Sequence, residues 1–242
     1  MINALFWGLF AASSLLIGAG LAIKFNLSQR TIGIIMAFGV GVLISAVAYE
    51  LTEEAFHTVG ADSSIVIGLV GGALTFYIGN SILTRKGAGK RKNSKSIQHS
   101  NSPLAIVLGS ILDGIPESIV LGLGLVKGGT ISYAMLIAVF LSNLPEAISA
   151  TSGLIRNGWK NFSILLMWSS VVAVSGIASL AGFVVMDQAD SSLVAFTLSF
   201  SAGALLTMIT DTMIPEAYDN AGSLTGIVTT LGFGLAFWLS IL

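Results

Sequence analysis

The chain has 242 residues, of which 54% are hydrophobic and 10% are charged, and its mean hydropathy is +0.90. Because charged residues make up about 25% of a typical soluble domain, this composition excludes an ordinary soluble protein and predicts an all-α membrane protein. The formal net charge is −1 and cysteine is absent, so disulfides and thiolate metal sites are excluded and no nucleic-acid partner is expected.

The predicted elements are apolar stretches, and about 20 such residues are needed to cross the hydrocarbon core of a bilayer. Eight stretches of this length follow one another, at roughly 2–23, 32–56, 64–83, 103–126, 130–155, 161–186, 192–217 and 221–242. The first has no basic start and no clear cleavage site, so we interpret it as a retained span rather than a signal peptide. We therefore expect residues 1–242 to form a single polytopic domain, a bundle of eight transmembrane helices.

The basic residues predict the orientation of this bundle, because Lys and Arg accumulate in cytoplasmic loops. With eight spans, ten of the eleven basic residues fall on one side and only Lys127 falls on the other. Both termini are then extracytoplasmic, in a multi-pass protein of the cell (inner) membrane. Residues 84–102 are basic and rich in Gly, Ser and Asn, which predicts a flexible cytoplasmic loop between the third and fourth helices.

Carboxylates occur in or at the ends of the apolar stretches, and no Lys or Arg occurs there with them. They are Glu50, Glu53, Glu54, Asp113, Glu117, Glu146, Asp211 and Glu216. An ionisable group at bilayer depth costs at least a few kcal/mol, so such groups are rare and indicate function. Because the spans contain no base to pair with them, protons or metal cations are the expected partners.

Three of the spans contain a Pro-Glu pair, at Pro116-Glu117, Pro145-Glu146 and Pro215-Glu216. A proline inside a helix removes one backbone hydrogen bond and frees the carbonyl four residues earlier. At membrane depth such a carbonyl is tolerated only where it is buried in protein or lines a cavity. Each pair therefore predicts a kinked helix that offers carboxylate and carbonyl oxygens, which suit hard or borderline cations.

The spacing places further polar groups beside these glutamates. Asp113 lies four residues before Glu117, so the two share a helix face, and Ser142 and Asn143 lie four and three residues before Glu146. The predicted metal site consists of Asp113, Glu117, Ser142, Asn143 and Glu146. The acids nearer the span ends are expected to flank this site or to line an exit path: Glu50, Glu54, Asp211 and Glu216. Glu53 is expected to be a solvated bystander.

These motifs resemble those of the ZIP family of divalent metal transporters. The matching motifs are Asp113-Gly-Ile-Pro-Glu-Ser and Ser142-Asn-Leu-Pro-Glu-Ala, on the fourth and fifth spans, with weaker likeness at Glu50-Leu-Thr-Glu-Glu-Ala and Asp211-Thr-Met-Ile-Pro-Glu-Ala. The resemblance implies that Glu117 and Glu146 are metal ligands and that Asp113 stands where the family usually has histidine. Gly114 and Ser179 replace an asparagine and a glutamate, so a second metal site has lost ligands.

The resemblance implies a function as well as a fold. It implies transport of a divalent cation toward the cytoplasm by alternating access, without ATP hydrolysis, and it permits a homodimer. The transported ion is the only metal expected, with no cofactor and no enzymatic activity. Zinc is the family default, whereas an all-oxygen site also suits manganese or iron(II). An ion-coupled carrier of another solute and an intramembrane hydrolase stay open as alternatives, although the chain contains no His-Glu-x-x-His motif.

Overall fold

Each of the predicted apolar stretches coincides with a helical segment in the computed structural model, which describes residues 1–25, 27–83, 103–126 and 132–241. The predicted cytoplasmic loop 84–102 lies outside the described residues. In chain order the elements are α1 (Ile2–Lys24), α2 (Gln29–Ser45), the π-helical segment η1 (Ala46–Thr52), α3 (Glu53–Val59), α4 (Ser63–Leu83), α5 (Pro103–Leu123), α6 (Tyr133–Arg156), α7 (Asn161–Met186), α8 (Ser191–Met208), the π-helical segment η4 (Ile209–Met213), α9 (Ile214–Ala221) and α10 (Leu224–Ser240). No strand occurs among these residues.

Six helices in the described part of the chain are long and apolar enough to cross a membrane. They are α1, the continuous helix 29–59 that joins α2, η1 and α3, α4, α6, α7, and the continuous helix 191–221 that joins α8, η4 and α9. The other two predicted spans are helical as well: α5 has 21 residues and α10 has 17. At about 1.5 Å per residue, α10 is a little shorter than a hydrocarbon core of about 30 Å. The chain is thus a multi-pass helical membrane protein.

Local sequence explains where several helices start and stop. Ser28, Ser132 and Asp190 precede α2, α6 and α8, and the side chain of each accepts a hydrogen bond from a backbone amide of the first turn. Gly60 and Gly222 follow α3 and α9 with positive φ angles of 70° and 64°, a conformation that glycine adopts without steric cost. These polar and glycine residues separate the long apolar helices.

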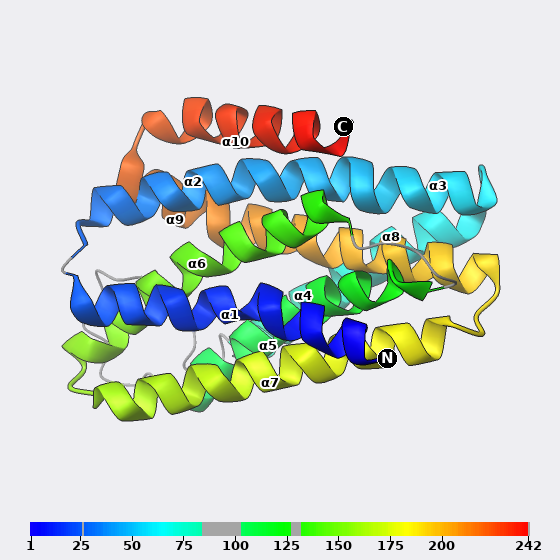
Figure 1. Ribbon diagram of the computed structural model, residues 1–242. Helices are drawn as coiled ribbons and strands as arrows, with labels where there is room; N and C mark the ends of the chain where they lie inside the picture. The colour runs from blue at the N-terminus through cyan, green and yellow to red at the C-terminus, as the bar shows by residue number, and fades with distance from the viewer. Residues whose placement is uncertain (26, 84–102, 127–131, 242) are drawn as a thin grey trace.

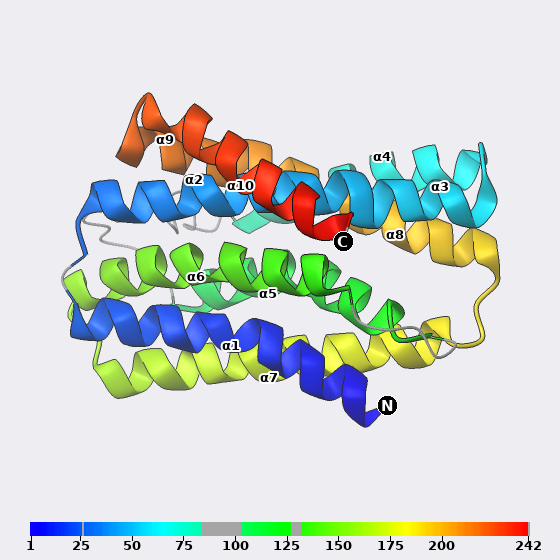
Figure 2. The same ribbon diagram turned by 45° about the horizontal axis from the view of Figure 1, so that its top comes forward.

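The helices pack as two groups that meet along α6. In the first group α1 packs against α6 and α7, and α5 packs against α7. In the second group α4 packs on α8, and α2 packs on α10 and α9. Figures 1 and 2 show α1 and α7 on one side of the bundle and α2 and α10 on the other. Contacts of α6 with α2 and of α5 with α8 join the two groups.

Glycine brings helices of the same group unusually close together. A methyl group on Gly122 of α5 would lie 1.9 Å from the carbonyl oxygen of Ser179 on α7, and one on Gly41 of α2 would lie 1.9 Å from that of Thr229 on α10. Between the groups the approach is less tight, because a methyl group on Gly39 of α2 would lie 3.1 Å from the α6 backbone. Each group is therefore locked internally by backbone contact through small residues.

The two ends of the bundle can be named by the elements that lie there. At the α3 end, α3 and α5 terminate and α6 and α8 begin, and both chain termini lie toward this end (Figure 1). At the α9 end, α1, α6 and α9 terminate and α2, α7 and α10 begin. The candidate site lies between these ends.

Candidate functional site

The five residues of the predicted metal site lie on α5 and α6, well away from the helix ends. Asp113 and Glu117 are on α5, and Ser142, Asn143 and Glu146 are on α6. All five are buried, with exposed fractions between 2% and 7%. Burial of three carboxylates in one region of a helical bundle is costly unless polar or cationic partners compensate it.

Serine hydroxyls from the opposite helix contact both motif glutamates. The Ser142 hydroxyl on α6 lies 3.4 Å from Oε1 of Glu117 on α5, and it shares its one proton with the carbonyl oxygen of Val139 in its own helix, at 3.0 Å. The Ser110 hydroxyl on α5 donates in return to Oε1 of Glu146 on α6, at 3.1 Å. The two bonds run in opposite directions between two neighbouring helices, so they hold carboxylate oxygens of both helices in one polar layer of the bundle.

The prolines do not break these two helices. Pro116 lies inside α5 and Pro145 lies inside α6, and both helices continue through them. The carbonyl freed by Pro145 belongs to Leu141, and its oxygen lies 3.1 Å from the position that a methyl group on Gly39 would take. This carbonyl therefore faces α2, at the contact between the two helix groups, where glycine leaves room for it.

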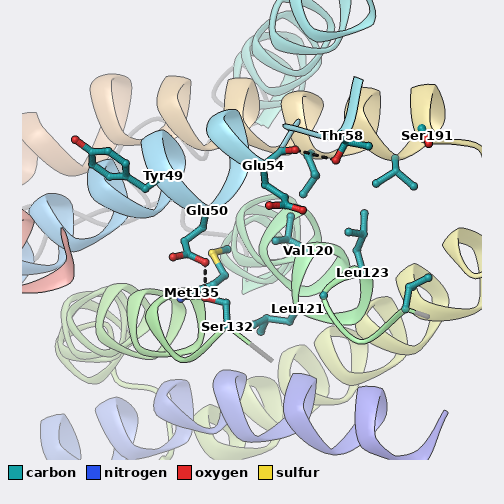
Figure 3. Close-up of a pocket in the computed structure, with 14 residues that line it drawn as sticks. Tyr49, Glu50, Glu54, Thr58, Val120, Leu121, Leu123, Ser132, Met135 and Ser191 are labelled. Carbon is teal, nitrogen blue, oxygen red and sulfur yellow. Dashed lines mark hydrogen bonds between the residues drawn. The ribbon is translucent and has the colours of Figure 1, made fainter. Parts of the chain in front are cut away.

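Glu50 and Glu54 line a cavity at the α3 end of the bundle. The cavity has a volume of about 450 Å³, and its walls come from η1, α3 and the adjacent ends of α5, α6 and α8 (Figure 3). The Ser132 hydroxyl, which precedes α6, donates to Oε2 of Glu50 at 2.5 Å. Thr58 and Ser191 add further hydroxyl groups to the lining.

Glu216 lies toward the opposite end of the bundle, in the first turn of α9. It is 9% exposed, and its Oε1 accepts a hydrogen bond of 2.5 Å from the fully buried Ser149 of α6. Asp211, one turn earlier in η4, is exposed and does not share this buried position. The four acids predicted to flank the site therefore lie on two sides of it, Glu50 and Glu54 toward the α3 end and Asp211 and Glu216 toward the α9 end.

Several functional features are not apparent from the sequence reasoning above. Ser110, Ser132 and Ser149 are serines that each donate to a glutamate of another element. Helical spacing could have identified two of them, because Ser110 lies three residues before Asp113 and Ser149 three residues after Glu146. The π-helical segments also went unpredicted, although such segments frequently mark functional sites. One contains Glu50 and the other contains Asp211.

Gly114 and Ser179 are the two positions at which the resemblance to the ZIP family implies lost ligands of a second metal site. Gly114 of α5 has no side chain, and Ser175 of α7 lies beside it, 3.4 Å from where a methyl group would be. The Ser179 hydroxyl, one turn further along α7, donates to the carbonyl oxygen of Ala4 at 2.8 Å, in a buried contact with α1. Its hydrogen bond thus directs this hydroxyl toward α1.

Glu53 occupies a different environment from the other acids. It is half exposed on α3 and lies 3.4 Å from Nε2 of His57, one turn along the same helix. Both side chains are exposed, as expected for a solvated pair that contributes little to stability.

In the part of the chain that the structure describes, no three His, Cys, Asp or Glu side chains are gathered closely enough to hold one metal ion. In this conformation Glu117 and Glu146 are held by serine hydroxyls of opposite helices instead. No protein-family model and no curated protein matches the chain.

Proposed function

We propose that the protein is a ZIP-type transporter that moves a divalent metal cation, zinc in the first instance, toward the cytoplasm by alternating access and without ATP hydrolysis. The observation that carries this proposal is the burial of Glu117 and Glu146 on adjacent helices, each hydrogen-bonded to a serine of the other helix. Acids buried in a membrane bundle are rare and indicate an ion pathway.

The distribution of charge supports a cationic cargo. Four acids are buried: Asp113, Glu117, Glu146 and Glu216. The basic residues that the structure describes are all exposed: Lys24, Arg30, Arg156 and Lys160. A divalent ion would bring positive charge to these buried acids, and its binding would displace protons from them.

The orientation is part of the proposal. The four described basic residues lie in the connections and helix termini of the α9 end, whereas Asp62, Asp187 and Asp190 lie in the connections of the α3 end. The positive-inside rule then places the α9 end in the cytoplasm of a cell whose inner membrane contains the protein. If α5 and α10 also cross the bilayer, the six long helices and these two make eight spans. An even number of spans places both termini on the same, extracytoplasmic side.

Transport follows from this orientation and from the two helix groups. The cation enters through the cavity at the α3 end, binds between α5 and α6 at Glu117 and Glu146 with help from Asp113, Ser142 and Asn143, and leaves past Glu216 at the α9 end. Relative movement of the two groups exposes the site to one side at a time. Within each group, glycines let neighbouring helices pack backbone against backbone, which supports movement of each group as a rigid body.

The alternative cargo is manganese or iron(II). Oxygen atoms of carboxylates, a hydroxyl and an amide make up the proposed ligand set, and imidazole is absent from it. Such ligands suit manganese and can hold iron(II), whereas imidazole and thiolate favour zinc, which also accepts carboxylates. Gly114 offers no side-chain ligand, and the Ser179 hydroxyl already donates to the carbonyl oxygen of Ala4. Both observations favour one ion in the site rather than two.

The test is metal uptake by vesicles that contain the purified protein. We expect Glu117→Gln and Glu146→Gln to lower uptake by more than about tenfold, because even outer partners of metal ligands are worth 10- to 100-fold. Glu53→Gln is the matched control, since this acid is exposed and pairs with His57 on α3. A competition series with zinc, manganese and iron(II) identifies the cargo. Wild-type vesicles that accumulate none of these ions would refute the proposal.

A further inference from the structure

Helix α6 is tied to the second helix group at each of its ends by a hydrogen bond from serine to glutamate. At the α3 end, the Ser132 hydroxyl donates to Glu50 of η1, and at the α9 end the Ser149 hydroxyl donates to Glu216 of α9. In both bonds a serine hydroxyl donates to a carboxylate oxygen. These two bonds differ from those at the candidate site, which join α5 and α6 of the same group.

The two bonds bracket the candidate site along α6. Ser132 and Ser149 are 17 residues apart in the sequence, and Ser142 and Glu146 lie between them. At about 1.5 Å per residue the two serines are about 25 Å apart along the helix axis, close to the thickness of a hydrocarbon core. One bond therefore lies on each side of the buried acids.

Both glutamates lie at points where their long helices depart from regular α-helical geometry. Glu50 is inside η1 of the continuous helix 29–59, and Glu216 lies three residues after η4, in the first turn of α9 in the continuous helix 191–221. Wider helical turns of this kind occur frequently at functional sites. At the Glu50 end, both partners of the bond also line the cavity of about 450 Å³ (Figure 3).

We propose that Glu50 and Glu216 are the two gate residues of the transport cycle, each held closed by a serine of α6. The inference rests on the proposed alternating-access function and assigns two residues to its conformational step. Any displacement of the first helix group against the second must stretch these bonds, because both connect α6 to the other group. When one bond breaks while the other persists, the bundle opens at one end and pivots about the other.

The absence of cysteine makes the test direct, since a single introduced thiol reports its own exposure without a background reaction. Leu121→Cys places a thiol at a buried position that lines the cavity at the α3 end. Met213→Cys places one at a buried position one turn before Glu216. Rates of alkylation by a small water-soluble maleimide then report opening at each end separately.

The variants separate the gate bond from other roles of the same serines. Ser132 also caps α6 by accepting from the amide of Met135, so Ser132→Asp keeps the cap but places a second carboxylate opposite Glu50, whereas Ser132→Thr keeps both functions. Ser149→Ala removes the other donor. Ser14→Ala is its matched control, because Ser14 is equally buried but donates to Ala11 within its own helix.

We expect Ser132→Asp to raise labelling of Leu121→Cys about tenfold, the equivalent of about 1.4 kcal/mol, and to leave labelling of Met213→Cys unchanged. Ser149→Ala should do the reverse, and Ser132→Thr and Ser14→Ala should change neither rate. Glu50→Gln provides a second variant at the α3 end with the same expected result as Ser132→Asp. Unchanged rates, or equal rises at both ends in every variant, would overturn the gate assignment.

The labelling experiment uses no metal, so its failure differs from a failure of the proposed function. Vesicles that accumulate metal while the gate variants label like wild type would retain the transporter and reject the gates. Selective labelling changes in a protein that accumulates no divalent metal would retain the gates and reject the cargo.

Discussion

Replacing Ser110 by alanine removes the hydroxyl that holds the Glu146 carboxylate. Ser110 is 5% exposed, and its hydroxyl lies 3.1 Å from Oε1 of Glu146. A hydrogen bond to a charged group contributes about 1.5–3 kcal/mol, and we take the lower figure because 3.1 Å is longer than the strongest bonds of this kind. If the bond positions Glu146 for the cation, a loss of about 1.5 kcal/mol weakens binding by about tenfold.

The assay is the concentration dependence of metal uptake into vesicles. We expect the half-saturating concentration for Ser110→Ala to rise about tenfold with little change in the maximal rate. The variant keeps the Glu146 carboxylate and loses only the hydrogen bond that positions it for the cation. Ser110→Thr retains a hydroxyl and should restore uptake. Ser14→Ala controls for the loss of any buried serine hydroxyl. A half-saturating concentration unchanged in Ser110→Ala, or raised equally in Ser14→Ala, would refute the reasoning.

Further predictions concern packing, a buried hydrogen bond and pH. Gly122→Ala should lower stability by about 1–3 kcal/mol, seen as a lower midpoint of thermal unfolding in detergent, because its methyl group would lie 1.9 Å from the Ser179 carbonyl oxygen. Gly20→Ala, whose methyl group meets nothing within 4 Å, should leave that midpoint unchanged or raise it. Thr151→Val should cost about 1–3 kcal/mol, because it leaves the indole N–H of buried Trp168 without its 2.9 Å acceptor, and Thr151→Ser should not. Metal affinity, measured by equilibrium dialysis, should fall on acidification because carboxylate ligands must be deprotonated, and a pH-independent affinity would contradict a carboxylate site.

The helices are largely readable from the sequence because their determinants are local. Membrane helices need long apolar runs, and their ends are set by neighbouring caps such as Ser28 and Asp190 or by glycines such as Gly60. Helical spacing likewise predicted that Asp113 shares a face with Glu117, and the structure places both in the buried interior. Whether these residues bind a metal stays a prediction.

The departures from regular helix could not be predicted in this way. Nothing in the periodicity of the segments that contain Glu50 and Asp211 distinguishes a π-helical turn from an α-helical one. A shift of one residue in such a turn changes the face on which every later side chain lies. Asp211 is exposed and Glu216 is buried, although they are only five residues apart in the sequence.

The sequence by itself determined that the chain is a helical membrane protein with acids and prolines inside its spans, because hydrophobicity and helical periodicity depend on nearby residues alone. Only the tertiary structure decided which serine donates to which glutamate, since Ser110 and Glu146 lie 36 residues apart and Ser149 and Glu216 lie 67 apart. Serine is small, common and tolerated on any helix face, so its sequence position carries no record of its partner. The carboxylates were identified by their place in apolar segments, and their serine partners only by the packing of helices that are distant in the sequence.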